Sequence, residues 1–235
     1  MSFLNHTKHF LRDLIIYPKY KKFDKTYDSY WQSRDISIRK FNDFQKYRAE
    51  FAEKFIKDND SVMDIGCGDG SLLEYLKDNC SVGKLLGIDF SPSVIEIAKK
   101  RGIKVINRDI ANVESLLDID KYDFITLFEV LEHITNSESL LQWAHEHANK
   151  YVFFSVPNTG FVAHRARLLS GKFPLQWKAH PSEHVRFWTV RDMKWWLNIQ
   201  NYKNFRMVCY GGIPVLNKLW PSMFAGGLIV SIQKK

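Results

Sequence analysis

The chain has 235 residues, 45% of them hydrophobic and 26% charged, which is typical of a globular protein of one ordinary domain. Its three cysteines, Cys67, Cys80 and Cys209, form no C-x-x-C pair, so the sequence excludes a disulfide framework and a cysteine zinc site and favours a reducing cytoplasm. The longest uncharged run, 219–233, is broken by Pro221 and two glycines and is too short to span a bilayer.

The net charge of +8 is distributed unevenly along the chain. Residues 61–149 carry 8 Lys and Arg against 15 Asp and Glu, whereas residues 150–235 carry 13 against 2. Most charged runs only solvate a surface, but a difference this large within one domain indicates that the C-terminal third meets an anionic partner. A phosphorylated substrate, a lipid surface and a nucleic acid all remain open.

The hydrophobic pattern predicts one helix before residue 60 and an alternation of strands and helices after it. Apolar residues recur at three- and four-residue spacing from Ile38 to Phe55, and the turn-forming run 58–60 ends this helix. The strands predicted next are 61–65, 84–90, 104–107, 122–128 and 151–156, and the helices are 71–78, 91–101 and 137–149. Strands that alternate with helices indicate a parallel sheet covered on both faces.

The pattern changes after residue 156. A helix near 161–170, a tryptophan-rich loop, a helix near 190–199 and strands at 205–210 and 227–232 are predicted there. Two consecutive strands with a short connection indicate an antiparallel pair that completes the sheet. Earlier in the chain, Thr135 followed by Glu138 predicts a capping box at the start of the helix 137–149.

The run VMDIGCGDG contains the end of the first predicted strand and the glycine-rich turn that follows it. Ligands of doubly wound sheets bind at the carboxyl ends of the strands, and Gly66 and Gly68 would let the backbone approach such a ligand closely. The dinucleotide pattern G-x-G-x-x-G needs a glycine where this chain has Ser71. Asp64 and Asp69 would also repel a pyrophosphate. The turn therefore suits a ligand with ammonium or hydroxyl donors and no phosphate.

S-adenosylmethionine meets this description, because it combines a zwitterionic amino acid, a sulfonium, a ribose diol and an adenine. Asp89 ends the second predicted strand, where its carboxylate would accept hydrogen bonds from both ribose hydroxyls, and Phe90 would lie against the adenine. Asp109 closes the third strand and would accept a bond from the adenine amino group. Asp89 alone also fits the ribose of NAD, so the missing third glycine decides between the two cofactors.

Four motifs in this order, VMDIGCGDG, GIDFS, NRDI and FITLFEVLEHI, resemble those of the class I S-adenosylmethionine-dependent methyltransferases. The resemblance implies a doubly wound, Rossmann-like α/β fold with a seven-stranded sheet, mostly parallel with an antiparallel last strand, and an N-terminal helical lid. It also implies a lid and anchor segment at 1–58 and a methyltransferase domain at 59–235, with an acceptor-covering insertion at about 158–200.

The same resemblance implies the residues of the cofactor site. Asp89 would hold the ribose, and Asp109 with Ile110 would flank the adenine. The residues implied around the methionine part are Asp64, Gly66, Cys67, Gly68 and Asp69 at the glycine turn, Phe128 and Glu129 as a floor beside the sulfonium, and Tyr30, Trp31 and Arg34 as a lid.

The C-terminal half is similar to the MetW branch of this superfamily, through the arginine-rich helix after the dipeptide PN and the later run HVRFWTVRDM. MetW-like proteins are tied to methionine biosynthesis, some as partners of homoserine acyltransferases. Related sequences resemble methyltransferases of surface-polysaccharide and natural-product pathways. The extra segment of about sixty residues before the glycine turn departs from MetW and favours a working transferase.

Methyl transfer to oxygen requires positioning of the acceptor and a base for its proton. The candidate bases are His133, in EVLEHI, and His180 and His184, in the loop predicted to cover the acceptor; Glu183 is a weaker candidate. Three arginines would either grip an anionic acceptor or stay solvated: Arg165, Arg167 and Arg186. The sequence shows no acidic cluster typical of metal-dependent catechol methyltransferases, so no metal is predicted.

The leading hypothesis is a cytoplasmic enzyme that O-methylates a small-molecule or glycan acceptor, with a sugar or sugar nucleotide of surface-polysaccharide biosynthesis as the first choice and with N-methylation open. The alternative is a MetW-like S-adenosylmethionine-binding subunit that modulates a partner acyltransferase in methionine biosynthesis. A nucleic-acid methyltransferase is least favoured. The aromatic and basic start, HFLRDLIIYPKYKKF, either packs across the cofactor pocket or contacts the inner face of the membrane. The oligomeric state stays open.

Overall fold

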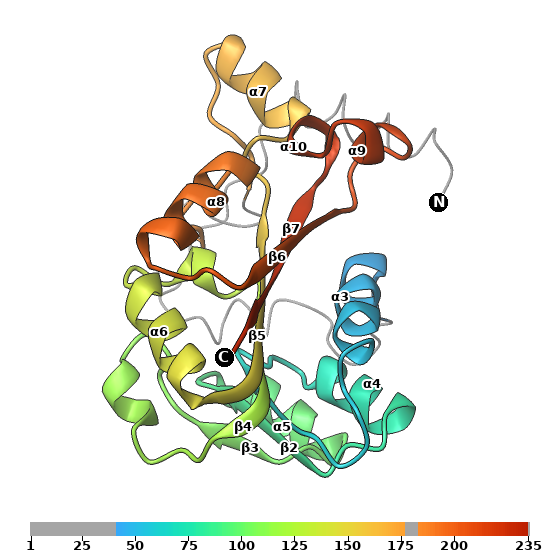
Figure 1. The fold of residues 1–235 in the computed structure, drawn as a ribbon, viewed down its shortest axis with the longest axis vertical. Helices are drawn as coiled ribbons and strands as arrows, with labels where there is room; N and C mark the ends of the chain where they lie inside the picture. The colour runs from blue at the N-terminus through green and yellow to red at the C-terminus, as the bar shows by residue number, and fades with distance from the viewer. Residues whose placement is uncertain (1–40, 177–182, 235) are drawn as a thin grey trace.

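The computed structural model describes residues 41–176 and 183–234, and its centre is one seven-stranded sheet (Figure 1). The strands are β1 (Ser61–Ile65), β2 (Lys84–Asp89), β3 (Val105–Asn107), β4 (Tyr122–Phe128), β5 (Ala148–Pro157), β6 (Phe205–Tyr210) and β7 (Gly227–Gln233). Their order is β3-β2-β1-β4-β5-β7-β6, with β1 to β5 parallel and β7 antiparallel to both of its neighbours. The predicted doubly wound sheet with an antiparallel last strand is confirmed.

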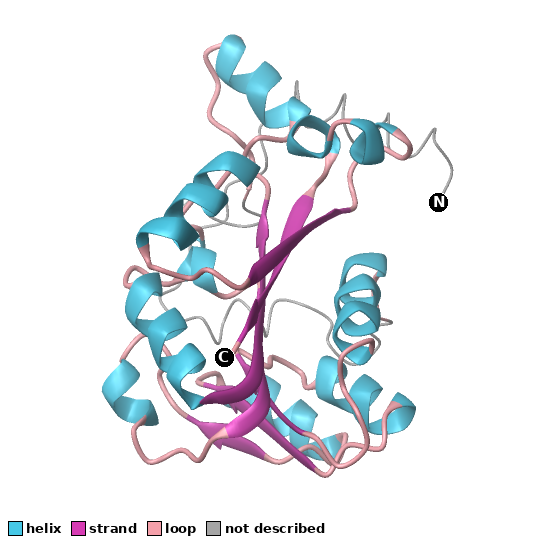
Figure 2. Cartoon of the chain, in the orientation of Figure 1, coloured by secondary structure: helices cyan, strands magenta, loops and turns pink. Residues whose placement is uncertain are grey.

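Helices cover both faces of this sheet (Figure 2). The helices of the described residues are α3 (Asp43–Glu53), α4 (Ser71–Asn79), α5 (Pro92–Lys100), α6 (Ser137–His147), α7 (Val162–Leu169), α8 (Val190–Ile199), α9 (Leu216–Leu219) and α10 (Pro221–Phe224), with short 3-10 turns at η2 (Val113–Leu116) and η3 (Leu131–His133). Helices α3, α4 and α5 pack on one face, and α6 and α8 pack on the other. Among the described residues, none of these helices is long and apolar enough to cross a membrane.

Strand β5 shows why the sheet needs both layers. Its residues Val152 and Phe154 are buried in the core under α6 and α8, while Phe153 is buried on the opposite face. There, Phe51 and Phe55 from the α3 segment lie with their ring centroids 5.6 and 5.1 Å from that of Phe153. Successive side chains of a strand point to opposite faces, so a run of apolar residues requires cover on both. Helix α3 therefore shares one core with the domain predicted to begin at residue 59.

Two local predictions were wrong. The helix α6 is capped by Asn136, whose side chain accepts a hydrogen bond from the Ser139 amide, and not by Thr135. Glu138 instead binds Arg186, so its carboxylate is committed to tertiary structure. The connection between β6 and β7 is also long rather than short, because it contains α9 and α10. The predicted lid residues Tyr30, Trp31 and Arg34, and His180, lie outside the described residues.

Candidate functional site

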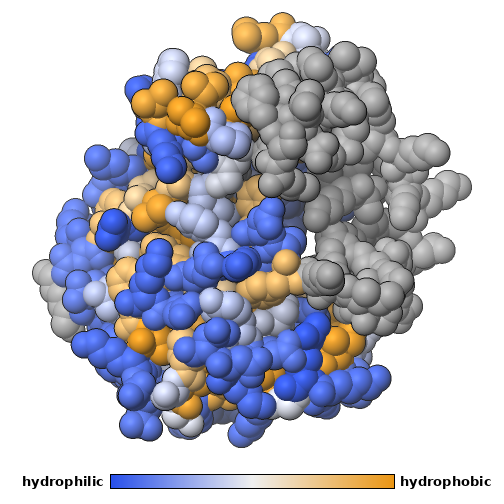
Figure 3. Space-filling model, turned by 90° about the vertical axis from the view of Figure 1, so that its right-hand side faces the viewer, coloured by the Kyte–Doolittle hydropathy of each residue, from blue (hydrophilic) through white to orange (hydrophobic). Residues whose placement is uncertain are grey.

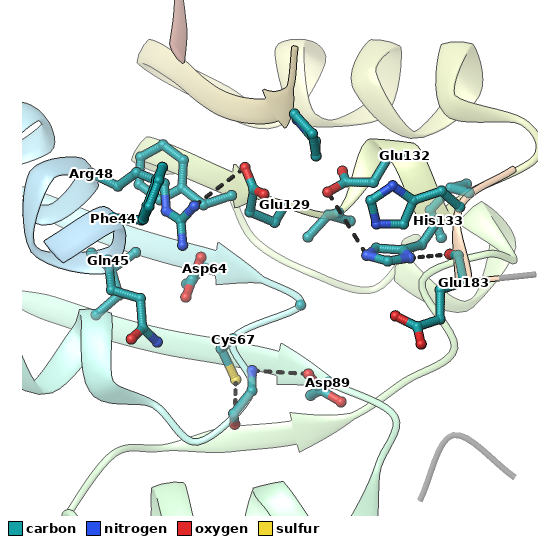
Figure 4. Close-up of a pocket in the computed structure, with 18 of the residues that line it drawn as sticks. Phe44, Gln45, Arg48, Asp64, Cys67, Asp89, Glu129, Glu132, His133 and Glu183 are labelled. Atoms are coloured by element: carbon teal, nitrogen blue, oxygen red, sulfur yellow. Dashed lines mark hydrogen bonds and ion pairs between the residues drawn. The ribbon is translucent and has the colours of Figure 1, made fainter. Parts of the chain in front are cut away.

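A cavity of about 860 Å³ lies at the carboxyl ends of the central strands (Figure 4). It is lined by these residues of the predicted cofactor site: Asp64, Gly66, Cys67, Gly68, Asp89, Phe90, Asp109, Ile110, Phe128 and Glu129. The same cavity is lined by Glu132, His133, Glu183 and His184. The fold thus brings the glycine turn, three strand ends and the described part of the predicted acceptor loop to one space.

The glycine turn has a backbone conformation that side chains tolerate poorly. Gly66, Gly68 and Gly70 have φ angles of 71°, 53° and 75°. A Cβ atom on Gly66 would lie 2.6 Å from a side-chain methyl carbon of Val130. Glycine is therefore required here both by φ and by close packing, and the bare backbone forms one wall of the cavity.

Asp89 ties this turn to the end of β2. One of its carboxylate oxygens accepts a hydrogen bond from the Gly68 amide at 2.9 Å, and the other accepts from the Ser91 amide at 3.0 Å. Because each carboxylate oxygen has two acceptor sites, both oxygens keep capacity for a further donor. A carboxylate fixed in this way, at the cavity wall, fits the diol of a ribose.

Asp64 is buried at the end of β1 and accepts a 2.6 Å hydrogen bond from the Thr126 hydroxyl. Burial raises the pKa of Asp64 to about 7, the Thr126 bond opposes this, and the negative charge of Asp89 adds to it. A cation placed beside Asp64 would restore its charged form. The pair of acids at β1 and β2 therefore fits a ligand that carries an ammonium group and a diol, as S-adenosylmethionine does.

Two residues of the glycine turn do not meet a ligand as free polar groups. Asp69 does not line the cavity, because its carboxylate accepts a 2.6 Å bond from the Ser71 hydroxyl and lies 3.5 Å from the Arg101 guanidinium. Cys67 lines the cavity but is buried, and burial raises the pKa of its thiol well above the ordinary value. Its sulfur packs under Gly87, where an added Cβ would lie 2.6 Å away, so Cys67 acts here by packing.

Arg48 is a site residue that the sequence analysis missed. It comes from α3, and its guanidinium lies 3.2 Å from the Glu129 carboxylate and donates to the Tyr210 hydroxyl at 3.0 Å. Ser155 donates a further bond to Glu129 at 2.7 Å. Glu129 itself has a φ of 58°, a left-handed conformation that these bonds hold in place. At the floor of the cavity, beside the predicted sulfonium position, the charge of Glu129 is thus balanced by Arg48 within a hydrogen-bonded network.

The three arginines considered for an anionic acceptor, or as solvated side chains, make structural contacts. Arg186 forms a two-oxygen ion pair with Glu138 of α6. Arg167 is buried and donates to the Phe173 carbonyl at 2.8 Å, and Arg165 donates to the Gly160 carbonyl at 2.6 Å. These contacts stabilise the segment between β5 and α8, and none of the three arginines is among the described residues that line the cavity, so the arginine grip stays an untested prediction.

The two described candidate histidines, His133 and His184, meet in the same cavity. The ring centroids of His133 and His184 are 4.7 Å apart in an edge-to-face arrangement. The Nδ1 atom of His133 bonds to the Glu183 carbonyl. Burial lowers the pKa of His133 and the Glu183 carbonyl partly offsets this, so the site favours the neutral ring. Glu132, a buried residue beside both histidines, was not predicted from the sequence.

The comparison with known families agrees with this geometry. Residues 36–206 match a family model described as a methyltransferase domain. The chain belongs to this methyltransferase domain family. Its activity is the transfer of a methyl group from S-adenosylmethionine, and the cofactor supplies that group in activated form on its sulfonium.

Individual relatives support the same assignment. The chain is 26% identical over 175 residues to a ubiquinone biosynthesis O-methyltransferase of Pelagibacter ubique, covering 67% of this chain and 71% of that one. It is 26% identical over 149 residues to a bifunctional methionine biosynthesis protein MetXA/MetW of Rhodopirellula baltica, covering 57% of this chain and 23% of that one. The fold matches magnesium protoporphyrin IX methyltransferase of Synechocystis PCC 6803 with bound SAH at a TM-score of 0.58 and 16% identity, covering 89% and 95%.

Proposed function

We propose that this methyltransferase acts on a hydroxyl oxygen of a small-molecule or glycan acceptor. The observation that carries the proposal is the layout of one cavity, which is lined by Asp64 and Asp89 and, on the other side from Asp64, by His133 with His184 packed against it (Figure 4). The acids suit the cofactor, and the imidazoles suit an acceptor that must lose a proton as the methyl group is transferred. Asp109, Ile110, Phe90 and the glycine turn complete the proposed cofactor side.

Two acceptor classes are consistent with this proposal. A sugar or sugar nucleotide of surface-polysaccharide biosynthesis is the first choice from the sequence, and its anionic form would suit the basic C-terminal third. A phenol is the second, because the Pelagibacter relative is named for an O-methylation step in ubiquinone biosynthesis. Amines, as nitrogen acceptors, form a third set of compounds for the test described next.

The test is formation of S-adenosylhomocysteine by the purified chain with sugar nucleotides, phenols and amines as separate acceptor sets. We expect turnover with one hydroxyl set, its loss in Asp89→Ala, and a fall of at least about 100-fold in kcat for His184→Ala. His147→Ala is the matched control, because this histidine stacks on Trp143 of α6, away from the cavity. Turnover with amines alone would refute the proposed acceptor chemistry.

A second candidate function is a MetW-like subunit that binds S-adenosylmethionine and modulates an acyltransferase. The similarity to the MetXA/MetW protein of Rhodopirellula baltica favours it. This candidate predicts tight cofactor binding, no turnover with any acceptor set, and stable co-purification with a homoserine acyltransferase. Turnover by the isolated chain would exclude it as the main function.

We also propose that one end of the molecule contacts an anionic membrane surface, which would deliver a lipophilic acceptor. Apolar side chains gather at the end that carries α7, α9 and α10 (Figure 3). The exposed members are Leu168, Leu169, Phe173, Val215, Leu219 and Trp220. They lie in the third of the chain with 13 basic and 2 acidic residues, so the patch and its surroundings complement an anionic bilayer. The N-terminal segment first considered for this contact lies outside the described residues.

Flotation with anionic and neutral vesicles tests the membrane contact. The variant Leu169→Glu/Leu219→Glu should lose flotation with anionic vesicles, because both side chains are exposed at this end, by 90% and 75%. Leu117→Glu is the matched control, since Leu117 is 70% exposed but follows η2, outside the patch. Equal flotation of all three proteins would refute the proposed surface.

A further inference from the structure

A buried carboxylate beside the candidate histidines has no hydrogen-bond partner in the described part of the chain. Glu132 in η3 is only 1% exposed, and neither of its carboxylate oxygens forms a hydrogen bond with a described residue. Burying an unpaired carboxylate is costly, and in proteins such groups are paired with a cation, protonated or bound to a metal. Within the described part of the chain, Glu132 is therefore a buried carboxylate that is open to an ion as its partner.

His133 is oriented as a ligand toward this carboxylate. Its Nδ1 must donate to the Glu183 carbonyl, since a carbonyl oxygen can only accept. Nε2 then carries the free lone pair, and it lies 3.8 Å from Glu132 Oε1. That distance is too long for a hydrogen bond, but two ligands on one ion can be up to about 4.4 Å apart when each bond is about 2.2 Å. A histidine fixed through its second nitrogen is the usual arrangement at metal sites.

His184 completes the cluster from a distant part of the chain. One ligand atom from each of Glu132, His133 and His184 lies within 4.8 Å of the other two. The backbone holds this arrangement, because the amides of Val185 and Arg186 both donate to the Glu132 carbonyl, at 2.9 and 3.1 Å. The residue that supplies the carboxylate thus also anchors the segment that supplies the second imidazole.

We propose that Glu132, His133 and His184 bind one divalent first-row transition ion in the cavity. Two imidazoles and one carboxylate are a donor set typical of such ions, and a three-residue site leaves coordination positions open to the cavity. If the acceptor binds as proposed above, its hydroxyl would take an open position and be acidified there. The two histidines would then act as ligands, the ion would lower the pKa of the bound hydroxyl, and the hydroxyl proton would pass to water in the open cavity as the methyl group is transferred.

The test is a titration of chelator-treated protein with Co²⁺, followed by visible absorption and by calorimetry, without any acceptor. We expect one ion per chain and a d–d absorption band that reports nitrogen and oxygen ligands. Glu132→Gln and His184→Ala should each weaken Co²⁺ binding by at least about 100-fold. His147→Ala, which removes a histidine elsewhere, should bind as the parent does.

Binding of S-adenosylmethionine by each variant provides the folding control, because the acids at β1 and β2 are separate from the cluster. The proposal would be overturned by no stoichiometric Co²⁺ binding in the parent, or by unchanged binding in a folded His184→Ala protein. A parent that binds Co²⁺ but methylates no acceptor would support the ion site and contradict the proposed hydroxyl acceptor. The two proposals therefore fail separately.

Discussion

The substitution Asp64→Asn should stabilise the cofactor-free protein at high pH and weaken cofactor binding. Asparagine has the shape of aspartate and can still accept the bond from the Thr126 hydroxyl. It cannot ionise, so it avoids the cost of placing a charge in a buried position. Asp64 is thus expected to be unfavourable for folding and favourable for function.

The magnitude follows from the two pKa values of Asp64. The carboxyl ionises near 3.8 in an ordinary setting and at about 7 in the folded protein. Between these values the folded chain keeps a proton that the unfolded chain has lost, so the free energy of unfolding falls as pH rises. The slope is about 1.4 kcal/mol per pH unit, which sets a ceiling of about 4 kcal/mol above pH 7. Water entering the open cavity lowers this ceiling, and we expect Asp64→Asn to gain about 2 kcal/mol in its free energy of unfolding above pH 7.

Thermal unfolding without cofactor, measured near pH 4 and near pH 8, checks the stability arm. The melting temperature of Asp64→Asn should match the parent near pH 4 and exceed it by about 4–8 °C near pH 8. Asp123→Asn is the control with the opposite sign. Burial would raise the pKa of Asp123, but hydrogen bonds from Ser61 and the charge of Lys150 hold it below its usual value. That stabilisation is present at neutral pH and lost as pH falls.

Calorimetric titration with S-adenosylmethionine checks the binding arm. The affinity of the parent should fall about tenfold per pH unit below pH 7, because the cofactor's ammonium group needs the ionised carboxylate. Asp64→Asn should bind weakly and without this pH dependence. A variant less stable than the parent near pH 8, or a parent whose affinity is flat from pH 5.5 to 7, would refute the reasoning.

Three further substitutions separate the site from its support. Gly66→Ala should lower the free energy of unfolding by about 1–3 kcal/mol, since its φ is 71° and a valine methyl carbon lies 2.6 Å from the new Cβ; urea unfolding measures this. Arg48→Met leaves Glu129 without its ion pair and should lower the free energy of unfolding by about 1–3 kcal/mol, as measured by urea unfolding. It should also weaken cofactor binding, as measured by calorimetry. Arg186→Gln breaks the pair with Glu138 and should cost about 1–2 kcal/mol while leaving the KM for an anionic acceptor unchanged.

The sequence predicted most of the fold because local patterns report burial directly. The bounds of β1, β4, β6 and α8 coincide with the predicted ranges, since each is a run with clear periodicity and turn residues at its ends. The cap of α6 was missed because two adjacent residues, Thr135 and Asn136, both carry capping side chains. The choice between them depends on the backbone geometry at the end of η3.

The meeting of most of the candidate cofactor residues in one cavity was predictable for a similar reason. Asp64, the glycine turn, Asp89 and Asp109 each occupy a strand end, and parallel strands bring their carboxyl ends to one edge. Strand order and direction therefore fixed their meeting before any side-chain contact was known. Asp69 shows the limit of this argument. Its carboxylate pairs with Arg101, which follows α5 in the sequence, and strand order does not predict that contact.

Only the tertiary structure decided the contacts between elements that are distant in the chain. Arg48 meets Glu129 because α3 packs on the sheet beside β5, and His184 meets Glu132 because backbone amides of its segment bond to η3. Periodicity along one element states which face is buried but not which residue of another element lies opposite. That pairing depends on how the elements pack in three dimensions, and here it determines the floor of the cavity and the proposed ion site.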